Sequence, residues 1–250
     1  MTTILMIATY GLEIVEVGGT LALHGQAGDN VYGAVLLCRP QWHDQVQAAA
    51  TILGVKEVEF LNFATGEVQV DVPSKMTLVR VLWRVRPDIL ITQDPEHSYH
   101  DLDPDRRLAM LLYLEAVALA GRDWRIEECG GYAPHTVRDL YYMSPEHSNC
   151  VVEIGQTFAI KQRALAELPY QIEYTAQVYR ERLGDELLAH LVSNPDLLKG
   201  DDLTLGRELH RQMDKALALS HGLLSHSGTV MSEAFRHQGV FRLKTLQTLL

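Results

Sequence analysis

The polar segment at residues 93–107 holds the side chains best suited to chemistry. His97, His100, Asp101 and Asp103 lie close together in it, directly after a short apolar run. Imidazole and carboxylate groups at such spacing could bind a divalent metal ion. These four residues do not have the spacing that would place them on one face of a helix as metal ligands, however, and loops rich in His and Asp are common on protein surfaces. A metal site and an ordinary solvated loop are therefore both open.

A second candidate loop covers residues 9–18. Its Glu13 and Glu16 could add carboxylates to such a site. Acidic side chains are also favoured near a helix N-terminus, which explains both residues without a metal. His221, His226 and His237 have no metal-site spacing, and we expect them at the surface.

Alternating strands and helices must position these two loops. Apolar runs predict strands at residues 4–10, 31–38, 57–63 and 88–93. Helices are predicted at residues 18–28, 42–53, 74–86 and 108–121. This alternation is typical of an α/β fold with a Rossmann-like, doubly wound, mostly parallel sheet. Ligands of such sheets bind outside the carboxyl ends of the strands, where both loops are expected.

The second half of the chain is less regular. A strand is predicted at residues 137–145, a strand end followed by a helix at 151–168, and a mainly helical region at 170–225 with breaks at Pro195 and Gly200. At 250 residues the chain suits one domain. We expect core β/α units at 1–121, with the C-terminal strands and helices of 122–250 packed on them.

Composition narrows the class of protein. A formal net charge of -10 argues against nucleic acid or anionic membranes as partners. The three cysteines are an odd number at no metal-like spacing, which favours a reducing cytoplasm. The first apolar run ends at Tyr10 and is too short for a signal peptide or a membrane span.

Three stretches of sequence resemble the LmbE/PIG-L deacetylase superfamily. ATYGLEIVEVGGTLA, from residue 8, ends in the family's GGTLA string. RPDILITQDPEHSYHDLDPDRRLA, from residue 86, resembles its RPD strand and HPDHR element, with Pro104, Asp105 and Arg107 in place. VRDLYYMSPEHSNCVVEIGQTFAIKQRAL, from residue 137, resembles its LYYxxP strand and the segment that follows. The resemblance implies a Rossmann-like fold and zinc-dependent N-deacetylase activity of the GlcNAc-conjugate de-N-acetylase type.

The residues that would carry this activity differ from the family pattern. The resemblance places the zinc ligands at Thr9, Leu12 and Arg106, the general base at Gly11, and an oxyanion-stabilising residue at Asp103. Hydroxyl, aliphatic and guanidinium groups are poor zinc ligands, glycine has no side chain, and a carboxylate would oppose an oxyanion. We therefore predict neither a catalytic residue nor a cofactor, although Asp105 matches the family.

Arg106 brings a positive charge to the position of a metal ligand. With Arg107 it could hold an anionic or polar small molecule, or it could pair with Asp103 or Asp94 and fill the cleft. The candidate ligand-binding residues are Thr9, Gln93, Asp94, Arg106 and Arg107.

Three functional hypotheses follow. The first is a pseudoenzyme that keeps a small-molecule cleft. The second is a hydrolase, either a deacetylase or a related hydratase, with zinc in a rebuilt site at His97, His100 and Asp103. The third is a structural partner of an active relative, and the frequent oligomerisation of the family is compatible with a homo-oligomer.

Overall fold

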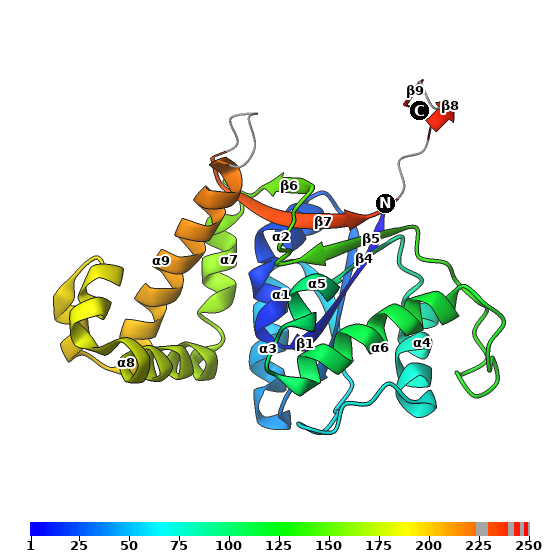
Figure 1. Ribbon diagram of the computed structural model, residues 1–250, viewed down its shortest axis with the longest axis horizontal. Helices are drawn as coiled ribbons and strands as arrows, with labels where there is room; N and C mark the ends of the chain where they lie inside the picture. Colours follow the sequence, from blue (N-terminus) through cyan, green and yellow to red (C-terminus); the bar gives the residue numbers. More distant parts are fainter. Residues whose placement is uncertain (224–229, 240–242, 246–247, 250) are drawn as a thin grey trace.

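A seven-stranded, mostly parallel sheet forms the centre of the computed structural model (Figure 1). The structure describes residues 1–223, 230–239, 243–245 and 248–249. The strand order is β3-β2-β1-β4-β5-β7-β6. The parallel strands are β3 (Val55–Phe60), β2 (Asn30–Leu37), β1 (Thr3–Tyr10), β4 (Ile89–Gln93) and β5 (Asp139–Met143). Strand β7 (Ser232–Gln238) runs antiparallel to β5 and to β6 (Cys150–Glu153). The predicted α/β class is confirmed.

Helices cover both faces of the sheet. One face packs against α1 (Leu12–Glu16), α2 (Gly18–Gln26), α3 (His43–Ile52) and α7 (Phe158–Leu165), and the other against α4 (Val72–Val85) and α6 (Pro104–Ala120). In β1, Ile4, Met6 and Ala8 face the first layer, while Leu5 and Ile7 face the second. Successive strand side chains point to opposite faces, so an uninterrupted apolar run fits a strand covered on both sides.

A helical arm lies beside this core (Figure 1). It consists of α8 (Pro169–Leu191), the short η2 (Pro195–Lys199) and α9 (Asp202–Leu223). Gly184, at a φ of 71°, interrupts α8, and α8 and α9 share a small apolar core of their own. None of the helices in the described ranges is long and apolar enough to cross a membrane.

The remaining elements are short. They are η1 (Pro40–Trp42), α5 (Pro95–Tyr99), and the antiparallel pair β8 (Leu243–Thr245) and β9 (Thr248–Leu249). The structure differs from the predictions at several elements: α1 and α5 lie in the two segments expected to be loops, β7 was not predicted, and β3 ends at Phe60 rather than at residue 63. Asn62 ends β3 early because its φ of 55° does not fit a strand.

The sheet reverses its winding between β1 and β4. Strand β1 pairs with β2 on one side and β4 on the other, and the chain moves outward in both directions from this pair. The carboxyl ends of β1 and β4 therefore border the crevice where open α/β sheets bind ligands. Residues 9–18 and 93–107 follow these two strand ends, as predicted.

Candidate functional site

Polar side chains meet where β1 and β4 end. The Thr9 hydroxyl donates a hydrogen bond to Gln93 Oε1 at 2.8 Å and lies 3.0 Å from the Tyr113 hydroxyl. All three side chains are buried. The hydroxyl of Thr9 is thus held by its neighbours within the protein.

Glu13 and Arg106 form an ion pair at the same crevice. Arg106 Nη2 lies 3.5 Å from Glu13 Oε1, and Nη1 lies 3.6 Å from Asp101 Oδ2. The backbone N–H groups of Thr9 and Tyr10 donate to Glu13 Oε2, the latter at 2.9 Å. The guanidinium carbon also lies 5.4 Å from the centroid of the Tyr10 ring. A fixed cation therefore stands at a position where the resemblance placed a zinc ligand.

Burial and charge act against each other in this pair. Burial raises the pKa of Glu13 to about 8, although the charge of Arg106 lowers it. Burial disfavours the charge on Arg106, but the carboxylates of Glu13 and Glu16 raise its pKa above the usual value. Arg106 therefore stays charged, while Glu13 exchanges its proton near neutral pH.

Asp103 and Asp105 shape the start of α6. Asp103 accepts a hydrogen bond from the Tyr10 hydroxyl at 2.7 Å and caps the helix by accepting from the Asp105 N–H at 2.9 Å. The buried Asp105 carboxylate accepts from the backbone N–H groups of Gly66 at 2.6 Å and Val68 at 3.4 Å. Both aspartates therefore have structural contacts in this crevice.

A second ion pair holds the buried Asp94. Arg236, on β7, donates to both Asp94 oxygens at 2.7 and 2.8 Å and lies over the Tyr142 ring at 4.5 Å. Arg107 donates to the backbone carbonyl of Asp101. Since Asp94 is held by Arg236, Arg106 pairs with Glu13 and Asp101 and not with Asp94 or Asp103, the pairing considered from the sequence.

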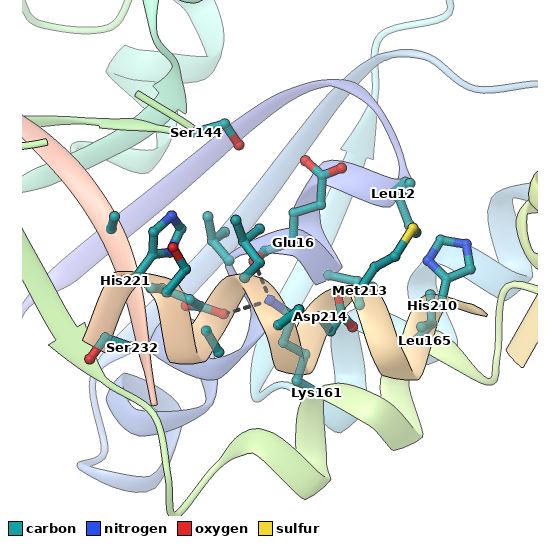
Figure 2. Close-up of a pocket in the computed structure, with 18 of the residues that line it drawn as sticks. Leu12, Glu16, Ser144, Lys161, Leu165, His210, Met213, Asp214, His221 and Ser232 are labelled. Carbon is teal, nitrogen blue, oxygen red and sulfur yellow. Dashed lines mark hydrogen bonds and ion pairs between the residues drawn. The ribbon is translucent and has the colours of Figure 1, made fainter. Parts of the chain in front are cut away.

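A cavity of about 910 Å³ lies beside this crevice, between the helical arm and the sheet (Figure 2). Helices α1, α7, α8 and α9 and strand β7 supply most of its wall. Leu12, at one of the family's zinc positions, also lines the cavity, so crevice and cavity adjoin. Its volume is within the usual range for small-molecule sites.

A buried ion pair forms part of the cavity wall. Lys161 Nζ lies 3.0 Å from Glu233 Oε1 and donates to the backbone carbonyl of Glu16 at 2.6 Å. Glu233 accepts from the N–H groups of Gly19 at 3.0 Å and Thr20 at 2.8 Å, at the start of α2. Sequence reasoning missed this pair, because 72 residues separate its members and no local pattern links them.

Comparison with known proteins adds to this geometry. The chain is 28% identical over 165 residues to a diacetylchitobiose deacetylase of Thermococcus kodakarensis; the match covers 65% of this chain and 61% of that protein. This chain therefore spans about three fifths of that relative's length. No family profile matches the chain.

Two solved structures share the fold. An N,N'-diacetylchitobiose deacetylase from Pyrococcus horikoshii has a TM-score of 0.66 at 18% identity, over 94% of this chain and 83% of that one. GalB, a 4-carboxy-2-hydroxymuconate hydratase from Pseudomonas putida KT2440, has a TM-score of 0.65 at 18% identity, over 98% and 100%. The similarity to the LmbE/PIG-L superfamily is confirmed. The LmbE-like fold is shared by enzymes of two reactions, so it does not by itself decide the chemistry.

The side chains at the LmbE zinc positions do not fit a zinc ion. The Thr9 hydroxyl is engaged by Gln93, Leu12 has no donor atom, and Arg106 is a cation. The general-base position also has no room for a side chain, because a Cβ added to Gly11 would lie 2.6 Å from Val46 Cγ2. A carboxylate there would need Val46 to move.

The alternative metal ligands have separate surroundings. His97 is exposed and lines the cavity, whereas His100 packs edge-on against Tyr99 with ring centroids 5.1 Å apart. Within the described ranges, no group of three or more His, Cys, Asp and Glu could hold a metal. A metal at His97, His100 and Asp103 stays a prediction for metal analysis. His221 also lines the cavity, and His226 lies outside the described residues.

Proposed function

We propose that this protein is a non-catalytic member of the LmbE-like group that binds a small molecule in the cavity beside the former metal crevice. The Glu13–Arg106 ion pair is the observation that carries the proposal. A guanidinium close to the family's metal position repels a divalent cation, and it is held in place by its contacts with Glu13 and Asp101. A crevice arranged in this way has no need of a metal.

The general-base position supports the same proposal. Amide hydrolysis in this family needs a metal-bound water and a carboxylate to take its proton. Gly11 offers no carboxylate, and Val46 occupies the nearby space. The cavity is a separate feature that does not depend on a metal, which is why binding is proposed without catalysis.

Metal content tests the proposal directly. We expect protein purified without a metal-affinity tag to hold far less than one zinc per chain, both as isolated and after incubation with excess zinc followed by desalting. Elemental analysis by mass spectrometry gives the stoichiometry. One zinc per chain would overturn the proposal, and loss of that zinc in His97→Ala and His100→Ala would then identify the rebuilt site.

Restoring the family's ligands provides a matched control. The triple variant Thr9→His, Leu12→Asp and Arg106→His supplies two imidazoles and a carboxylate, the set that leaves a water position open on zinc. We expect it to gain about one zinc per chain. If it does not, the crevice differs from the family in more than its side chains.

A further inference from the structure

The cavity wall combines apolar side chains with three carboxylates, two of which have no ion-pair partner in the part of the chain that the structure describes. Val15, Val17, Leu165, Met213 and Ala218 are among its apolar residues. Figure 2 shows the acidic residues Glu16 on α1 and Asp214 on α9 and the basic residue Lys161 on α7. A third acidic residue of the wall is Glu233 on β7. The balance of charge therefore depends on which of these groups neutralise one another.

Lys161 and Glu233 neutralise each other. Their side chains are nearly inaccessible to solvent, and their 3.0 Å ion pair is completed by backbone partners on both sides. A buried pair with all its hydrogen bonds made contributes little net charge to the space beside it. The charge available to a ligand comes from the other two carboxylates.

Glu16 and Asp214 remain without an ion pair among the described residues. The Glu16 carboxylate reaches into the cavity (Figure 2), and no described side chain donates to it. Asp214 accepts one neutral hydrogen bond, from the Gln162 amide at 2.6 Å. Two acidic groups therefore face the same cavity without a cation bound directly to either.

Of the three histidines in the wall, two contribute little positive charge, and the third, His97, lowers the pKa of Glu16 less than Arg106 and Lys161 do. Burial lowers the pKa of His210 and of His221, so both are mainly neutral at pH 7. Arg106 acts on Glu16 from a distance, but its own ion pairs are with Glu13 and Asp101. Burial raises the pKa of Glu16, the charges of Arg106 and Lys161 lower it, and the charge of Asp214 raises it again.

One buried polar group in the wall also lacks a partner. Ser232 is fully buried and lines the cavity, and within the described ranges its hydroxyl makes no hydrogen bond. Buried hydroxyls are normally hydrogen-bonded, so Ser232 marks a polar position behind the cavity wall that the described side chains leave unsatisfied.

We infer that this cavity binds a small organic cation, a protonated amine on a short apolar or partly hydroxylated body, through Glu16 and Asp214. The ammonium group would pair with the two carboxylates, and the body would contact the apolar wall formed by α1, α7 and α9. The inference rests on the proposed function, because it names the class of ligand that the cavity takes.

Three probes of equal length separate charge from size. Hexylamine, hexanol and hexanoate are titrated into the native protein at matched ionic strength, and binding is followed by calorimetry and by amide chemical shifts. We expect hexylamine to bind at least tenfold more tightly than either of the others. Glu16→Gln and Asp214→Asn should each weaken hexylamine binding about tenfold, whereas Glu181→Gln, an exposed position on α8 outside the cavity wall, should not.

The possible results are distinct. Equal binding of the three probes, or tighter binding of hexanol or hexanoate, would overturn the preference for a cation and leave a small-molecule function in place. No binding of any probe, or unchanged binding in both cavity variants, would overturn the inference. The zinc measurement is independent of all of these, so failure here does not imply failure of the non-catalytic assignment.

Discussion

Glu13 is a buried carboxylate whose charge depends on one neighbour. It accepts two backbone hydrogen bonds through Oε2, while Oε1 has only the more distant contact with Arg106, at 3.5 Å. Desolvation opposes ionisation, and the guanidinium favours it. The residue that gives the crevice its unusual charge is therefore also one that should respond to pH.

We expect Glu13→Gln to flatten the dependence of stability on pH. The pKa of Glu13 is raised from 4.5 to about 8 in the folded protein. Between these values the unfolded chain has lost the proton and the folded chain still holds it, so the native contribution of Glu13 is fully present at low pH and is lost as pH rises toward 8. The slope from one such group is at most about 1.4 kcal/mol per pH unit.

Urea unfolding at pH 5, 6, 7 and 8 measures this effect. The native protein should lose stability over the range more steeply than Glu13→Gln, and Glu181→Gln should behave as the native protein does. Parallel pH profiles for the native protein and Glu13→Gln would show that Glu13 is ionised throughout the range.

At the scale of elements, the helical arm depends on one close approach. A Cβ added to Gly206 on α9 would lie 2.1 Å from the backbone carbonyl oxygen of Ile172 on α8. The contacting atom belongs to a helix backbone and cannot rotate away. The absence of a side chain at Gly206 therefore sets the distance between α8 and α9.

Gly206→Ala should destabilise the arm by about 2 kcal/mol or more, because the overlap with α8 outweighs the gain of roughly 1 kcal/mol in helix propensity. Gly155→Ala is the control, since the nearest atom to its added Cβ is 4.0 Å away. Denaturant unfolding gives the stability change, and hydrogen exchange locates it. A neutral or stabilising Gly206→Ala would show that the helices separate at little cost.

The helices and strands of the first half of the chain were predictable because each has a recognisable pattern of apolar residues within its own segment. A continuous apolar run such as that of β1 needs only its own residues to be identified as a strand buried on both faces. Strand β7, with the sequence SEAFRHQ, has no such pattern, and its place in the sheet comes from pairing with β5 and β6. Its buried Glu233 is explained by Lys161 and the start of α2, which are distant in sequence.

The candidate site also has a part that local motifs predicted and a part that depends on long-range packing. The family strings located the crevice and the changed positions Thr9, Leu12 and Arg106, since each lies in a recognisable motif. The partner of Arg106 was not predictable, because it depends on how α1 and the start of α6 meet. The cavity was not predictable either, because it depends on how α9 packs against β7. Ion pairs between distant segments leave no periodic trace in a sequence.

At the scale of the whole molecule, Lys161 and Glu233 connect three distant parts of the chain. Lys161 lies on α7, Glu233 on β7, and the N–H groups that Glu233 accepts from belong to α2. Residues 19 and 233 are 214 positions apart. This ion pair therefore holds β7, the last strand of the main sheet in chain order, against the N-terminal half of the fold.

Lys161→Met should cost about 3 kcal/mol of unfolding free energy, because it leaves the Glu233 carboxylate buried without its cation. The exposed pair Lys199–Asp196, at 2.9 Å, is the matched control, and Lys199→Met should change stability by less than about 0.5 kcal/mol.

In the double variant Lys161→Met and Glu233→Gln no buried charge is left unpaired, and the amide oxygen of the introduced glutamine can still accept a hydrogen bond from the N–H groups of α2. The double variant should therefore be more stable than Lys161→Met alone. Urea unfolding of the four proteins measures these differences. If Lys161→Met were no more costly than Lys199→Met, β7 would be held by its apolar contacts and its pairing with β5 and β6, and the ion pair would contribute little to joining the two halves.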